Sequence, residues 1–229
     1  MPYEESPLYR IKSSKRARRL ALRLDPIERI FHLTVPARCP MAKAYHFADS
    51  HEEWMLNTLN DLPEPCPFIN GAIIPLCGKQ TKIKIHLKPD AKITKIAQEK
   101  DSLIITTNKN DPSSRIERYL KNQAKNILKE KSEEKAVTIS KKIENITVRD
   151  TKSRWGSCSS EKTLSYSWRL IFAPPEAMDY VVAHEVAHLK HLDHSRAFWS
   201  LCRQLSDNFI DGQYWMQNHG HELMKYGTK

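Results

Sequence analysis

The stretch 181-VVAHEVAHLKHLDHSRAFW-199 decides the predicted fold, because it places several histidines and a glutamate at helical spacing. His184 and His188 belong to one HExxH pattern, and residues four positions apart project from the same face of a helix. Both imidazoles can therefore bind one metal ion. Glu185 lies about 100° around the helix from His184, so its carboxylate can reach a metal-bound water without binding the metal itself. The pattern predicts metal-assisted hydrolysis.

The alternative to a metal site is packing, since a histidine that lies alone on an apolar helix face usually belongs to the core. Here four histidines fall within residues 184–194. Each buried imidazole needs a polar partner, and four of them so close together are difficult to satisfy. The sequence therefore favours a metal centre, and imidazole ligands in this arrangement favour zinc.

The third ligand is either His191 or His194. His191 continues the helical face, but its Cα would lie about 10 Å along the axis from that of His184, too far for unstrained tetrahedral bonds from both. His194 lies between Asp193 and Ser195, which are good helix-capping residues and predict a turn of the chain. We therefore favour His194 and expect His191 to be an orienting or surface residue.

Length and composition indicate an ordinary globular protein. The chain has 229 residues, of which 40% are hydrophobic and 28% charged. No apolar run approaches the roughly 18–20 residues of a membrane span, and 1-MPYEESPLYR-10 is unlike a signal peptide, so we expect a cytoplasmic protein without membrane contact. The five cysteines are odd in number and include no CxxC pair, which argues against disulfides and against a zinc ribbon.

The net charge of +10 is uneven, with +8 falling in residues 1–139. Basic residues are densest in 10-RIKSSKRARRLALR-23 and between Lys79 and Lys131. Such an excess is compatible with a nucleic acid or an acidic partner. The simpler interpretation is a solvated surface, because aromatic residues are not interleaved with these charges.

Hydrophobic periodicity predicts an α+β fold in which a β-rich basic portion, 1–111, precedes a catalytic portion, 112–229, the two forming one compact unit. Proline residues at 63, 65 and 67 form a stiff linker. The expected strands are 17–25, 29–36, a pair within 69–87, 102–108, 143–150 and 163–173, with a loop at 155–160; the expected helices are 40–60, 112–137, 175–191 and 195–206.

Three segments in order carry a family resemblance: RWGSC (154–158), SWRLIFAP (167–174) and DYVVAHEVAHLKHLDHSRAFW (179–199). This arrangement resembles the YgjP-like metal-dependent hydrolases, which are related to SprT-like and minimal zincin metallopeptidases. The resemblance implies a zincin-like fold, with an antiparallel-rich sheet packed on the HExxH helix. It also implies one Zn²⁺ per chain, bound by His184, His188 and His194, with Glu185 as general base and acid.

The same resemblance places Trp155, Gly156 and Ser157 beside the active site, as weak candidates for substrate binding. Cys158 is interpreted as a small buried thiol. The segment 163–170 is a candidate platform for an extended peptide, and an ordinary core or edge strand is an equal alternative. The donor that stabilises an oxyanion stays open among Tyr180, Tyr214, His219 and His221, and Phe198 and Trp199 are expected to be core packing.

The expected function is therefore that of a zinc metallopeptidase which cleaves peptide bonds in a peptide or protein substrate. Two alternatives remain at this point. One is a nucleic-acid-associated protein in which zinc is structural, and the other is a metal hydrolase of a non-peptide amide. No cysteine follows Cys202, so the zinc ribbon of SprT proteins is absent and their DNA-linked proteolysis is not implied.

Overall fold

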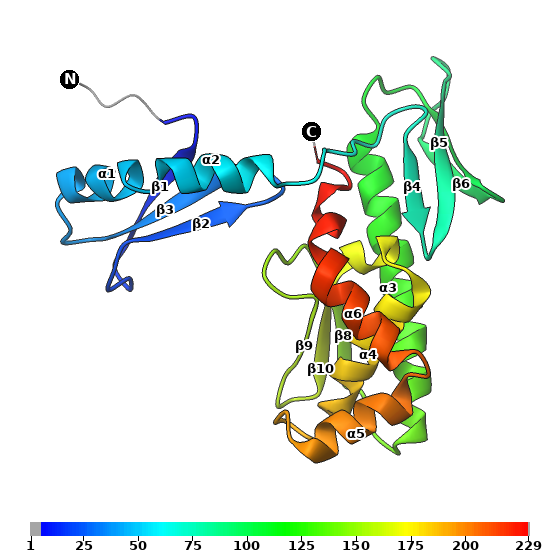
Figure 1. Cartoon of the computed structure of the whole chain (residues 1–229). Coiled ribbons are helices and arrows are strands. Elements are labelled where there is room, and N and C mark those ends of the chain that lie inside the picture. Colours follow the sequence, from blue (N-terminus) through cyan, green and yellow to red (C-terminus); the bar gives the residue numbers. More distant parts are fainter. Residues whose placement is uncertain (1–5, 229) are drawn as a thin grey trace. The chain divides into compact units, whose positions relative to one another are not determined.

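The computed structural model describes residues 6–228, which form two compact units (Figure 1). The first unit comprises the described residues up to Glu64 together with Thr228, and the second runs from Pro65 to Gly227. The division between the units falls within the proline-rich linker, at Glu64 and Pro65. The boundary expected at 111/112 lies inside the second unit. None of the helices in the described part of the chain combines the length and apolar character that a bilayer-spanning helix requires.

The first unit is a three-stranded sheet with two helices. Its elements are β1 (Tyr9–Ser14), β2 (Ala21–Asp25), β3 (Ile30–Pro36), α1 (Met41–Asp49) and α2 (Glu52–Asn60). The order is β1-β3-β2, and the central strand buries Phe31, Leu33 and Val35, as its period-two pattern requires. The expected hairpin is present. The single helix expected over 40–60 is divided near Ser50, whose hydroxyl donates to the carbonyl of Phe47.

The second unit contains a four-stranded sheet and a long helix. The strands are β4 (Ile73–Leu76), β5 (Lys79–Leu87), β6 (Lys95–Glu99) and β7 (Ser102–Thr107), in the order β4-β5-β7-β6, and the helix is α3 (Ser113–Thr138). The turn between β4 and β5 uses Cys77 and Gly78 at φ values of 50° and 82°, as two-residue hairpins do. Buried residues of β5 and β7, such as Ile83 and Leu103, join one core cluster with those of α3.

The rest of the second unit is a small sheet and the helices around the histidines. It consists of β8 (Asn145–Arg149), β9 (Gly156–Cys158), β10 (Thr163–Ser167), the 3-10 helix η1 (Trp168–Phe172), α4 (Pro175–Ala187), α5 (Arg196–Leu205), α6 (Phe209–His219) and the 3-10 helix η2 (Gly220–Lys225). The strand expected over 163–173 is shorter and ends at Ser167. The segment 155–160, expected to be a loop, contains the strand β9, and the helix expected over 175–191 ends at Ala187.

The sheets are mixed, which corrects the expectation of an antiparallel-rich sheet. Each sheet contains one parallel pair: β1 with β3, β5 with β7, and β8 with β10. In each sheet, the second strand of a hairpin pairs in parallel with the strand that precedes that hairpin in the chain. Hydrophobic alternation specifies which face of a strand is buried and carries no information about which strand lies beside it. The fold is thus mixed α+β, with small mixed sheets.

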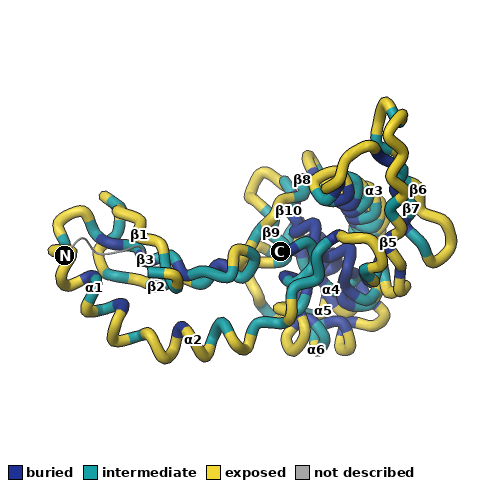
Figure 2. Tube along the Cα trace, turned by 90° about the horizontal axis from the view of Figure 1, so that it is seen from above, coloured by how far each residue is buried: buried dark blue, intermediate teal, exposed yellow. Residues whose placement is uncertain are grey.

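Helix α4 lies at the centre of the second unit and contacts α3, α5, α6 and β9. Figure 2 shows the buried residues gathered along α3 and α4. Seven apolar side chains of α4 are buried, on all sides of the helix, as in a helix enclosed by neighbours. Lys135 of α3 pairs with Asp179 of α4 at 2.8 Å and also donates to the carbonyl of Leu205. These contacts fix the helix that carries His184 and Glu185.

The basic excess belongs mainly to the second unit. Residues 1–64 contain 10 Lys+Arg and 9 Asp+Glu, whereas residues 65–139 contain 15 and 8. The basic stretch 10–23 is therefore nearly balanced within its own unit. The lysines lie instead along β5, β6 and α3.

Candidate metal centre

The sequence Pro174-Pro175 starts α4, since proline suits the first turn of a helix, and Glu176 lies in that turn. The helix presents His184 and Glu185 in its last turn and ends at His188, which is the C-cap. His188 thus lies where the chain leaves the helix, and the residues after it turn toward α5.

Three imidazoles meet at this end of α4. Ring nitrogens of His184, His188 and His194 lie within 4.8 Å of one another. The Nε2 atoms of His184 and His194 are 3.3 Å apart. The structure therefore brings together the three histidines that the sequence favours, and the side chain of His191 is not among them.

The turn that places His194 depends on its two neighbours. The backbone N–H of Ser195 donates to Asp193 Oδ1 at 3.3 Å. Ser195 is the N-cap of α5, and its hydroxyl oxygen accepts from the N–H of Phe198 at 3.4 Å. Ser195 is thus the helix cap expected from the sequence, whereas Asp193 stabilises the turn that precedes the helix.

His191 acts through its backbone. The Nδ1 atom of His188 lies 2.9 Å from the carbonyl oxygen of His191. A carbonyl can only accept, so Nδ1 carries the proton and Nε2 keeps its lone pair. This contact fixes the tautomer of His188 that a metal needs.

The two helix histidines are held neutral. Burial, followed by the nearby imidazoles, lowers the pKa of His184 to about 4, and burial is also the main cause that lowers the pKa of His188. Metal ligands must be deprotonated, so both rings are ready to bind near neutral pH. The Nδ1 atom of His184 is buried and has no hydrogen-bond partner within the described part of the chain.

Two aromatic residues of α5 pack against the imidazoles. Phe198 stacks on His188 with ring centroids 4.5 Å apart and meets His184 edge-on at 4.9 Å. Trp199 lies 5.6 Å from both His184 and His194. These residues were expected to be core packing, and Phe198 is fully buried in the core cluster while Trp199 packs against it. Both also pack against the candidate ligands, which was not expected. The feature of the sequence that could have placed them at the site is their position three and four residues after Ser195, the cap that follows His194.

The side chain of Glu185 is enclosed between its own helix, α4, and the neighbouring strand β9. It is only 5% exposed, and burial raises the pKa of its carboxyl group to about 8, opposed by the positive charge of Arg154. Gly156 makes room for it, because a Cβ atom at that position would come within 2.5 Å of Glu185 Cγ. A carboxyl group in this setting can exchange a proton near neutral pH.

Cys158 and Cys202 lie near Glu185 and remain thiols. Burial, reinforced by the charge of Glu185, raises the pKa of Cys158 to about 11 and that of Cys202 to about 12. A neutral thiol is a poor nucleophile and a poor metal ligand. This agrees with the interpretation of Cys158 as a packed thiol, although its side chain is only half-buried.

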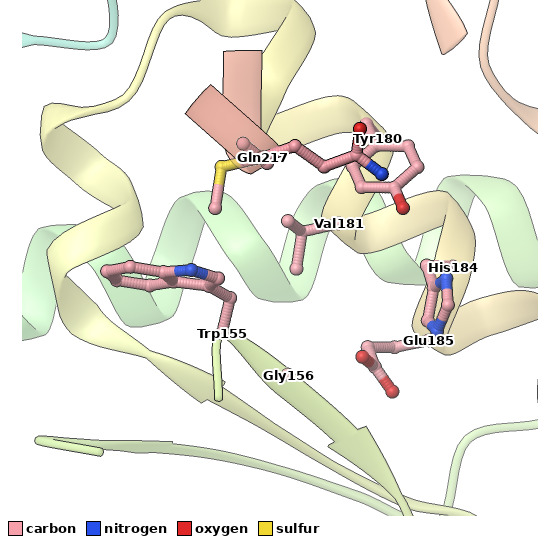
Figure 3. A pocket seen from close by; sticks show the side chains of 8 residues that line it. Trp155, Gly156, Tyr180, Val181, His184, Glu185 and Gln217 are labelled. Carbon is pink, nitrogen blue, oxygen red and sulfur yellow. The ribbon is translucent and has the colours of Figure 1, made fainter. Parts of the chain in front are cut away.

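A pocket of about 260 Å³ adjoins His184 and Glu185 (Figure 3). Of the three weak substrate-binding candidates, Trp155 and Gly156 line it and Ser157 does not. Of the four candidates for an oxyanion donor, Tyr180 lines it, whereas Tyr214, His219 and His221 do not. The complete lining is Trp155, Gly156, Tyr180, Val181, His184, Glu185, Met216 and Gln217.

Strand β10 cannot serve as the peptide platform, because β8 and β9 occupy both of its edges. Both outer strands, β8 and β9, have a second edge that pairs with no strand in the described chain, and β9 is the one that contacts α4 and contributes Gly156 to the pocket. The N–H of Ser167 donates to the carbonyl of Trp155 at 2.8 Å, and that of Ser159 to the carbonyl of Thr163 at 3.0 Å. By the alternation of antiparallel pairs, the backbone polar groups of Gly156 and Cys158 face the open edge.

A mixed α+β fold with three histidines and a buried glutamate at one site is typical of metal-dependent hydrolases. The family model "YgjP-like, metallopeptidase domain" matches residues 18–219. The chain therefore belongs to the YgjP-like metallopeptidase family, and at this general level it is a metal-dependent peptidase with a peptide or protein substrate.

Two further comparisons complete this result. The crystal structure of the metallopeptidase zymogen abylysin from Pyrococcus abyssi is similar over 41% of this chain and 95% of its own, with 19% sequence identity and a TM-score of 0.36. Comparison with curated proteins gives no match. The family description names a peptidase domain and lends no support to nucleic-acid binding.

Proposed function

We propose that this chain is a zinc-dependent peptidase of zincin-like fold in which His184, His188 and His194 hold one zinc ion and Glu185 is the general base. The observation that carries the proposal is the meeting of three imidazoles beside one buried carboxyl group.

The donor set fits zinc. Two nitrogens bound to one tetrahedral zinc at about 2.0–2.1 Å are roughly 3.3 Å apart, and the Nε2 atoms of His184 and His194 are separated by 3.3 Å. The group formed by His184, His188 and His194 has three members. Structural zinc sites use four protein ligands, whereas catalytic sites use three and keep a position open. The ligand count therefore favours a catalytic role over a structural one.

When bound, zinc would polarise the scissile carbonyl group and make water more acidic. Glu185 would take a proton from the attacking water and later deliver it to the leaving amine. A divalent cation nearby lowers the pKa of a carboxyl group, so we expect that of Glu185 to fall below 8 in the loaded protein. Its enclosure by Gly156 would hold the carboxylate in one position.

The substrate would bind as an extended strand along β9. The backbone groups of Gly156 and Cys158 face the open edge, where a peptide can add by strand pairing. Tyr180 is the proposed oxyanion donor. Its hydroxyl is hydrogen-bonded to Gln213, which lowers the pKa of Tyr180 while burial raises it overall. Gln213 would donate to that oxygen, which leaves the O–H free to donate to substrate.

The first prediction concerns Glu185→Gln in the zinc-loaded protein. We expect turnover of a mixed peptide library to fall by about 10²–10⁴-fold, because the amide cannot accept a proton. Zinc content should be unchanged. Tyr180→Phe should lower turnover at unchanged zinc content as well. The matched control is Glu161→Gln, an exposed residue of the β9–β10 turn, which should keep full activity.

Two results would contradict the proposal. One is equal turnover by the wild type and Glu185→Gln, which would remove the carboxylate from the mechanism. The other is a zinc-loaded wild type that cleaves no peptide in the library.

A further inference from the structure

We propose that the pocket between α4, α6 and β9 receives one apolar side chain of the peptide substrate, next to the scissile bond. This inference rests on the proposed function and adds the substrate class to it. The favoured side chains are those of medium size, such as leucine, methionine and phenylalanine.

The walls of the pocket are apolar. Val181 of α4 and Met216 of α6 contribute aliphatic surface and are 5% and 8% exposed. Trp155 contributes the face of an aromatic ring from the β9 side, as Figure 3 shows. An apolar side chain that leaves water for such a surface is stabilised in proportion to the area buried.

The polar groups of the pocket lie at the reaction end and at the rim. His184 and Glu185 stand together at one side (Figure 3), and Gln217 lines the pocket from α6. An aspartate or glutamate of the substrate would meet the carboxyl group of Glu185 and would lose its hydration, and among the described residues no lysine or arginine lines the pocket to pair with it. The pocket therefore selects against acidic side chains.

The shape of the pocket is fixed by two close approaches at glycine. A Cβ atom at Gly212 of α6 would lie 2.6 Å from Tyr180 Cβ and would also collide with the carbonyl oxygen of Glu176. A Cβ atom at Gly220 would lie 3.2 Å from Trp155 Nε1 and 3.4 Å from Met216 Cε. The walls therefore pack closely on their supports and have little freedom to widen. A pocket of this kind discriminates by size.

The pocket is continuous with the open edge of β9. Gly156 lines the pocket, and its backbone polar groups face that edge. A peptide paired there would direct alternate side chains to one face of the sheet, the face that carries α4. One residue of the substrate would thus enter the pocket while its backbone lies beside the histidines.

The test compares peptides that differ at a single position, with Leu, Phe, Ala or Asp, using the full-length zinc-loaded protein. We expect the wild type to prefer Leu over Ala by at least tenfold in kcat/KM, since one methylene group in an apolar pocket contributes about 10–200-fold. Met216→Ala and Val181→Ala enlarge the pocket and should shift the preference from Leu toward Phe. Met224→Ala is the control, because Met224 is equally buried at 6% exposure but lines no part of the pocket.

A second readout does not depend on turnover. The affinity of Glu185→Gln for uncleaved peptides, measured by titration calorimetry, should show the same order of Leu over Ala. A wild type that cleaves Leu and Asp peptides equally, or a preference left unchanged by Met216→Ala, would overturn this inference and leave the peptidase itself intact. Failure of the zinc-loaded wild type to cleave any peptide would overturn the proposed function and the inference together.

Discussion

At the scale of single residues, the site depends on a few positions that the sequence specifies to different degrees. The spacing of His184 and His188, and the caps around His194, were sufficient to predict which imidazoles meet. The carbonyl of His191 and the rings of Phe198 and Trp199 were not predictable as parts of the site. A backbone contact leaves no trace in residue type, and an aromatic residue is equally suited to any core.

Gly156 is the residue on which the position of the Glu185 carboxylate depends. Gly156→Ala should displace that carboxylate, because the added Cβ atom would come within 2.5 Å of Glu185 Cγ. We expect at least a tenfold loss of kcat and a loss of about 1–3 kcal/mol in the free energy of unfolding. Turnover assays and denaturant unfolding measure the two effects.

The matched control is Ser157→Ala, the next residue of β9, which does not line the pocket. It should be nearly neutral in both assays. A Gly156→Ala protein with wild-type kcat would show that Glu185 needs no such space.

At the scale of elements, the predicted helices and the central strands agree best with the structure, and the edge strands agree least. The three unexpected strands, β1, β6 and β9, all lie at the edge of a sheet. Edge strands are short and polar, so they lack the alternating apolar pattern by which strands are recognised. β9 is the extreme case, since its sequence Gly-Ser-Cys reads as a loop.

The connection between α4 and α5 gives a prediction at this scale. Ser195→Ala removes the side chain that caps α5, and we expect a loss of about 1 kcal/mol in the free energy of unfolding. Because the same turn carries His194, zinc affinity should fall as well, as measured by competition with a chromophoric chelator. Ser200→Ala, at an exposed position within α5, should change neither quantity. Unaltered zinc affinity in Ser195→Ala would show that the helix cap at Ser195 does not position His194 for metal binding.

At the scale of the whole molecule, the chain divides near Glu64 rather than at 111/112. Periodicity identified the helices and strands on both sides of position 111. It could not show that buried residues of the β4–β7 sheet, such as Ile105, share one cluster with α3 and α4. Long-range packing of this kind is not encoded in any local pattern.

Truncation tests this division. A fragment of residues 65–229 should fold cooperatively and bind one zinc ion, because it retains the whole core cluster around α4. A fragment of residues 112–229 should not fold, because it lacks Ile83, Leu103 and Ile105, which are fully buried in that cluster. Circular dichroism and thermal unfolding give the answer, and cooperative unfolding of the shorter fragment would support the boundary at 111/112 instead.

The central claim is that His184, His188 and His194 hold a metal beside Glu185, and elemental analysis of the purified protein tests it most directly. We predict about one zinc per chain in the wild type, in Glu185→Gln and in His191→Ala, which keeps the carbonyl that orients His188. His194→Ala should be depleted of zinc. Absence of metal from the wild type even after addition of zinc, or full zinc content in His194→Ala together with loss in His191→Ala, would contradict the account.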